Sequence, residues 1–141
     1  MSLRPPLLAL RVTAAFQSLL MLAQTALAGG FLGGHFDMLA LHGTLGRVIT
    51  VVALLMAVAA FLVHRAKGPR SVLPASLVVL LALVGQIALG LAHSVAAHVL
   101  LGTLLACAVA LLLQRAMTTP LPARTPAAAT PHRTAPPEPA P

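Results

Sequence analysis

Four long runs of apolar residues, separated by short polar segments, make up most of the chain. They cover residues 12–32, 38–63, 72–92 and 95–114. A bilayer core is about 30 Å thick, and an α-helix needs roughly 20 apolar residues to cross it. Each run reaches that length. The pattern predicts an all-α membrane protein: an antiparallel bundle of four transmembrane helices, made of two tandem helical hairpins within residues 1–117.

The segments outside these runs have the composition of loops and of a tail. Residues 29–37 (GGFLGGHFD) are rich in glycine, which indicates a turn-rich loop. Residues 65–70 (RAKGPR) form a short basic loop, and the link at His93 and Ser94 is shorter still. Residues 118–141 are mostly Pro, Ala and Thr. Such a segment cannot bury apolar surface, so we expect a disordered cytoplasmic tail.

Composition and charge agree with a membrane location. Hydrophobic residues make up 59% of the 141 positions and charged residues 8%, against about 25% charged in soluble domains. The net charge of +7 would suggest nucleic acid in a soluble protein, but here basic residues flank apolar runs, and the chain has no Trp or Tyr to stack bases. We therefore expect the lipid bilayer, and no nucleic acid, around this protein.

The distribution of basic residues predicts the orientation. All of them except Arg47 fall on one side of the predicted bundle, before the first run, in residues 65–70, and from Arg115 onward. Basic residues favour the cytoplasmic side. We expect a multi-pass protein of the bacterial inner membrane with both termini cytoplasmic. The basic start and the residues before Gly29 also fit a cleavable signal peptide. A retained helix is favoured because part of it recurs later.

That recurrence is an internal repeat. Residues 23–28 (AQTALA) align without gaps with residues 85–90 (GQIALG). Each hairpin has a glutamine near the outer end of its first helix and His-x-x-x-Gly near the outer start of its second. Hairpins that run the same way are related by an axis along the membrane normal, which places the two histidines at equal depth, facing each other. The repeated residues are Gln24, His42 and Gly46 in the first hairpin and Gln86, His98 and Gly102 in the second.

Two histidines facing each other at one depth match the axial ligands of a haem, since both imidazoles must approach one iron from opposite sides. Gly46 and Gly102 lie one turn below them on the same helix faces and would admit the flat porphyrin. We predict one b-type haem bound by His42 and His98 near the outer face, for electron transfer or for haem carriage or sensing. A redox partner or a second copy of the chain is the expected protein partner.

Three further polar residues are assigned to this site. Gln24 and Gln86 are expected either to line the edge of the porphyrin or to bond between helices. Arg47 lies about 7.5 Å below His42 at 1.5 Å per residue. A charged side chain at that depth needs a partner, and helical side chains lean toward the N-terminus, which is outward here. A haem propionate or Asp37 is the expected partner.

Other functions remain open at this stage. Small residues at helical spacing also serve plain packing, so an accessory membrane subunit without haem is the main alternative. A small transporter would need more polar groups inside the membrane than this chain has. No nucleophile–base set, phosphate-binding loop or carboxylate pair marks an enzyme, and no catalytic residue is predicted. A metal site is a further alternative, built from His35, His42, His93 and His98.

The first hairpin resembles a pattern found in small four-helix bacterial membrane proteins of uncharacterised function. Residues 11–117 also resemble one four-helix half of the haem A synthase family, whose halves carry histidines on their second and fourth helices. This resemblance implies haem b ligation by His42 and His98. Residues 29–37 lack the cysteine pair of many haem A synthases and residues 38–42 lack an acid, so haem hydroxylation by this chain alone is not expected. The first pattern reads Gln24, Ala28-Gly29, Asp37, His42 and Gly46.

Overall fold

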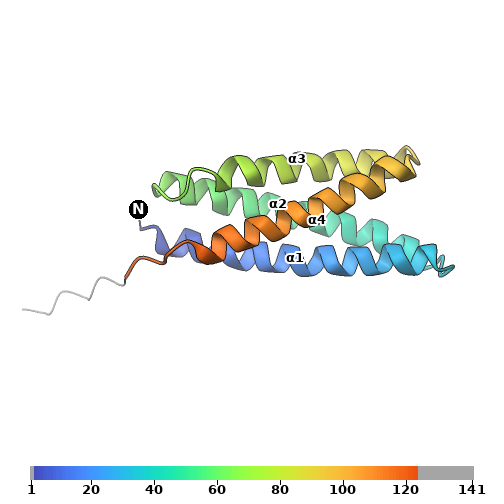
Figure 1. The fold of residues 1–141 in the computed structure, drawn as a ribbon, viewed down its shortest axis with the longest axis horizontal. Coiled ribbons are helices and arrows are strands. Elements are labelled where there is room, and N and C mark those ends of the chain that lie inside the picture. The colour runs from blue at the N-terminus through green and yellow to red at the C-terminus, as the bar shows by residue number, and fades with distance from the viewer. Residues whose placement is uncertain (1, 124–141) are drawn as a thin grey trace, which may run out of the picture.

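The computed structural model describes residues 2–123, which form a bundle of four α-helices (Figure 1). Each helix packs against the next, and α4 packs back against α1, so that α1/α3 and α2/α4 are the two diagonals of the bundle. The predicted antiparallel four-helix architecture is confirmed. The predicted tail lies, from residue 124 onward, outside the described residues. The helices are α1 (Arg4–Leu32), α2 (Met38–Arg65), α3 (Val72–Leu91) and α4 (Val95–Thr118).

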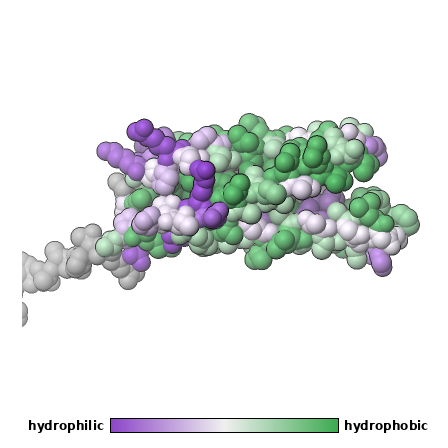
Figure 2. All heavy atoms as spheres, viewed as in Figure 1, coloured by the Kyte–Doolittle hydropathy of each residue, from purple (hydrophilic) through white to green (hydrophobic). Residues whose placement is uncertain are grey.

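All four helices are long and apolar enough to cross a membrane. Their outward faces carry many large exposed apolar side chains, among them Val12, Leu54, Leu81 and Leu104. Figure 2 shows these apolar side chains covering most of the length of the bundle, with hydrophilic residues gathered near one end. Such a surface would be unfavourable in water and is suited to lipid. The chain is therefore a multi-pass membrane protein.

Helix α1 begins at Arg4, about two turns before the predicted start at residue 12. Pro5 and Pro6 lie within its first turn. Proline is tolerated in the first turn of a helix, because the N–H groups there have no partner within the helix. The added turns are packed, since Leu7 and Leu10 are each only 1% exposed. Because of this extension, the start of α1 lies beside the C-terminal end of α4.

Arg11 joins the first turns of α1 to the end of α4 there. Its Nε donates to the carbonyl oxygen of Ala116 at 3.0 Å, and its Nη2 donates to those of Met117 and Thr119 at 3.1 and 2.6 Å. The last carbonyl groups of a helix have no partner within the helix and carry partial negative charge. The guanidinium therefore satisfies the C-terminus of α4 and links it to α1.

Replacing Arg11 with methionine is expected to lower the free energy of unfolding by about 1–2 kcal/mol, since three charge-assisted hydrogen bonds are lost at a half-buried site. The free energy is measured by unfolding in mixed detergent micelles. Arg115→Met is the control: it removes an equal charge from the same end, and no side-chain hydrogen bond of Arg115 is found among residues 2–123. Equal losses in the two variants would show that Arg11 acts only through its charge.

The packed core occupies only one half of the bundle. Buried side chains end at Met21 in α1 and at Leu83 in α3, and they begin at Ile49 in α2 and at Leu105 in α4. We call this half, which contains both described ends of the chain and residues 66–71, the basic end. The other half, the histidine end, contains residues 22–48 and 84–104, none of which is buried. Figure 2 shows the histidine end split by a notch between the two hairpins.

Candidate cofactor site between the two hairpins

His42 of α2 and His98 of α4 face each other at the histidine end. Their ring centroids are 6.0 Å apart, and the ring planes are inclined by 57°. The two residues belong to diagonal helices and to different hairpins, and both are half-buried. The structure thus brings together the pair of histidines singled out by the repeat.

Each histidine is held through its backbone by the glutamine of its own hairpin. Gln24 Nε2 donates to the carbonyl oxygen of His42 at 3.0 Å, and Gln86 Nε2 donates to that of His98 at 2.7 Å. Two roles were expected for the glutamines: to line the porphyrin edge or to bond between helices. These contacts are bonds between helices. The same contact occurs in both hairpins, as the repeat requires.

The glycines one turn below the histidines make these bonds possible. A helical carbonyl lies beside the residue four positions later, so a side chain at that position hinders lateral approach to it. A Cβ at Gly46 would lie 3.4 Å from Gln24 Nε2, and one at Gly102 would lie 2.9 Å from Gln86 Nε2. The amides of Gln24 and Gln86 thus lie beside the two glycines that are predicted to admit a porphyrin.

Gly102→Ala is expected to lower the free energy of unfolding by about 1 kcal/mol, because the new methyl group displaces the Gln86 amide from the His98 carbonyl. Gly43→Ala is the matched control, since a Cβ there meets nothing within 4 Å among the described residues. The control is expected to be neutral or stabilising, as alanine is the better helix former. Unfolding in mixed micelles compares the two. A stable Gly102→Ala protein would contradict the role given to this glycine.

The imidazole of His98 has a defined tautomer. Its Nδ1 lies 3.0 Å from the carbonyl oxygen of Gln86. A carbonyl can only accept, so Nδ1 carries the proton, and the neutral ring then has a lone pair on Nε2. Gln86 and His98 are therefore bonded reciprocally, each side chain to the backbone of the other. Ligand histidines in metal sites are commonly oriented by a bond of this kind.

The imidazole of His42 is held less closely. The backbone of Gln24 faces this ring as a hydrogen-bond acceptor, but the contact is looser than that of His98, because the buried Nδ1 of His42 has no close, well-aligned hydrogen-bond partner among residues 2–123. The two halves of the repeat thus agree in the glutamine-to-backbone bond and differ in the histidine-to-backbone bond. The sequence pattern does not predict this difference, because both hairpins carry the same glutamine and histidine.

The remaining predicted residues lie apart from the pair. The Arg47 side chain is exposed and donates to Thr44 Oγ1 at 3.2 Å, on its own helix. His35 and His93 are exposed. In the part of the chain that the structure describes, no three His, Cys, Asp or Glu side chains lie close enough to hold a metal ion. The alternative of a four-histidine metal site therefore gains no support.

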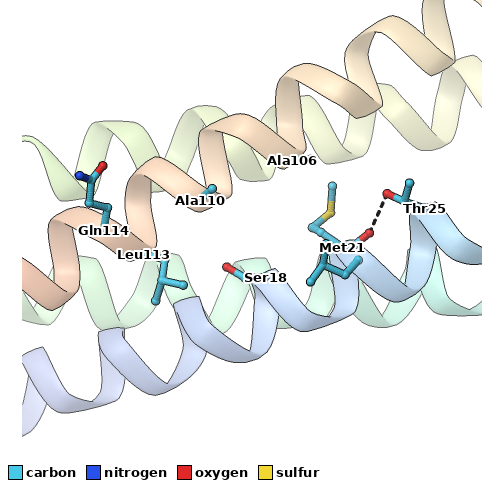
Figure 3. Close-up of a pocket in the computed structure, with 8 residues that line it drawn as sticks. Ser18, Met21, Thr25, Ala106, Ala110, Leu113 and Gln114 are labelled. Atoms are coloured by element: carbon cyan, nitrogen blue, oxygen red, sulfur yellow. Dashed lines mark hydrogen bonds between the residues drawn. The ribbon is translucent and has the colours of Figure 1, made fainter.

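Two hollows lie elsewhere. One, of about 460 Å³, is at the basic end beside His64, Lys67 and Arg70. The other, of about 330 Å³, is a groove between α1 and α4 that includes Ser18 and Ala110 (Figure 3). Neither contains His42 or His98. Both are open surface features. Among residues 2–123, two of the predicted ligands meet at the histidine pair.

Comparison of the chain with protein-family models, curated proteins and solved structures finds no match. The class of the protein is therefore defined by its own fold and geometry. It is a four-helix membrane protein in which each hairpin presents one histidine, anchored by a glutamine, toward the other hairpin.

Proposed function

We propose that this protein binds one b-type haem between its two hairpins, with His42 and His98 as axial ligands. The observation that supports this most is the pairing of the two imidazoles at 6.0 Å between ring centroids. Two nitrogens bound at about 2 Å on opposite sides of one metal ion are about 4 Å apart, which puts the ring centres about 6 Å apart. The distance matches bis-imidazole ligation.

Two further features support a haem here over plain packing. His98 donates its Nδ1–H to the Gln86 carbonyl oxygen, which leaves Nε2 as the ligand atom. The pair also lies in the half of the bundle where no described side chain is buried. A wide, flat, apolar cofactor between the hairpins would cover the inner faces that α1–α2 and α3–α4 leave open there.

The proposed role is electron transfer, or haem carriage or sensing, near the outer face of the bacterial inner membrane. Haem supplies one-electron redox chemistry when bound. The chain would supply two imidazoles as ligands of the iron, which would leave no open position, so reactions that need one are disfavoured. The basic end lies on the cytoplasmic side in this proposal, because basic residues favour that side.

The test is the haem content and absorbance spectrum of detergent-purified protein, oxidised and reduced with dithionite. The expected result is one haem per chain with sharp, split α and Soret bands. The double variant His42→Ala/His98→Ala is expected to contain no haem, and the double variant His35→Ala/His93→Ala is the control with the same number of histidines removed. Absence of haem after expression with ample haem, or equal haem in all three proteins, would refute the proposal.

A further inference from the structure

The two halves of the repeat differ at one position that faces the histidines. Gly90 in α3 aligns with Ala28 in α1. A Cβ at Gly90 would lie 3.2 Å from Cε1 and 3.4 Å from Nδ1 of His98, tighter than ordinary contact. The His98 ring therefore rests directly on the backbone of α3, at a place where a side chain would push the ring away by a few tenths of an ångström.

This glycine also explains the hydrogen bond of His98. Gly90 is four residues after Gln86, so its missing side chain uncovers the Gln86 carbonyl, just as Gly102 uncovers that of His98. The carbonyl oxygen has two lone pairs and accepts both from the helix and from His98 Nδ1. In the first hairpin the corresponding carbonyl is that of Gln24, and the residue four positions later is Ala28, which is half-buried.

We infer that residues 28 and 90 make the two axial histidines unequal. Gly90 lets His98 bond closely to the Gln86 carbonyl, whereas the Ala28 methyl group holds His42 farther from the Gln24 carbonyl. His42 is then the ligand that is displaced by an incoming small molecule. The assignment of His42 as the displaced ligand rests on the proposed haem site. The difference in hydrogen bonding between the two rings does not depend on haem. Ala28 and Gly90 are thus positioning residues, which act through the histidines.

The unequal bonding has a chemical consequence for binding. A hydrogen bond from Nδ1–H to a carbonyl fixes the orientation of the ring and makes its other nitrogen more basic, and loss of such a bond typically weakens metal binding about 10–100-fold. His98 has this support in full, and His42 has only the looser contact with the Gln24 backbone. A small neutral ligand of iron, such as carbon monoxide, should therefore enter on the His42 side.

The first arm of the test needs no haem. Histidine labelled with ¹⁵N in the haem-free protein reports the tautomer of each ring by NMR. Wild type is expected to show His98 entirely as the Nδ1–H form and His42 as a mixture. Ala28→Gly should move His42 to the Nδ1–H form, and Gly90→Ala should make His98 a mixture. Identical tautomers in wild type, or no response to either substitution, would overturn the inference about the rings.

The second arm uses the reduced, haem-loaded protein and carbon monoxide. Ala28→Gly is expected to slow carbon monoxide binding about tenfold, and Gly90→Ala to accelerate it about tenfold. Gly29→Ala and Gly85→Ala are the controls, since a Cβ at either position meets nothing within 4 Å among the described residues. Rates unchanged in both test variants would overturn the assignment of His42 as the displaced ligand.

The two arms separate this inference from the proposed function. A protein without haem but with unequal tautomers would refute the haem site and retain the positioning by residues 28 and 90. A protein with haem but with equal tautomers and unchanged rates would retain the haem site and refute the positioning. If Gly90→Ala does not fold, Ala28→Gly decides alone, because it removes a methyl group and creates no clash.

Discussion

Replacing His42 with alanine is expected to leave haem bound to His98 alone, with one axial position of the iron open. The reduced protein should lose its sharp α band and bind carbon monoxide about tenfold or more faster than wild type. His98→Ala should have a different result. The remaining ligand, His42, has no close hydrogen bond on Nδ1, so haem content should fall about tenfold during purification. Spectra and haem content per chain measure both effects.

Chemical rescue provides the control for these single variants. Imidazole added to His42→Ala is expected to restore the sharp bands, because the truncated side chain leaves a space of the same shape on one side of the iron. Gly29→Ala, which contacts nothing within 4 Å among the described residues, should behave as wild type. Equal haem loss in the two histidine variants would show that the ligands are equivalent.

Replacing Gln17 with leucine is expected to stabilise the protein. Gln17 is 0% exposed in the middle of α1, and neither Nε2 nor Oε1 has a hydrogen-bond partner within residues 2–123. A buried amide without partners costs about 1–3 kcal/mol, and leucine of similar volume removes that cost. The free energy of unfolding in mixed micelles should rise by about 2 kcal/mol.

Ser76→Ala is the matched control for Gln17→Leu. Ser76 is also 0% exposed, but its hydroxyl donates to the carbonyl oxygen of Val72 at 2.8 Å. Its replacement should change the free energy of unfolding by less than about 1 kcal/mol. A destabilised Gln17→Leu protein would contradict the expectation and show that the Gln17 amide contributes to a polar contact.

The sequence predicted the architecture well for a physical reason. The bilayer demands about 20 apolar residues per helix, so the ranges of α2 and α3 follow from hydropathy within two residues at each end. Hydropathy failed at the start of α1, where Pro5 and Pro6 are helical. Hydropathy also predicts the end of α4 at residue 114, whereas the helix extends to Thr118. Arg11 donates hydrogen bonds to carbonyl groups at that end.

Only those features of the site that recur in both hairpins could be predicted from the sequence. Equal positions of His42 and His98 in the two hairpins predicted that they would face each other, and their rings are neighbours. The role of Gly46 and Gly102 was harder to predict, because small residues beside a histidine suit a porphyrin and a glutamine amide alike. The difference between Ala28 and Gly90 was not interpretable until the Gln86 carbonyl was placed against His98.

The position of the packed core separates assembly of the bundle from binding of the proposed haem. Side chains that hold the four helices together lie between Pro6 and Met21 in α1 and at the matching levels of the other helices, while the histidines stand beyond them. Insertion into the membrane and docking of the hairpins can therefore be completed before any cofactor arrives. Damage to the site should produce an intact but empty protein, and damage to the core should remove both.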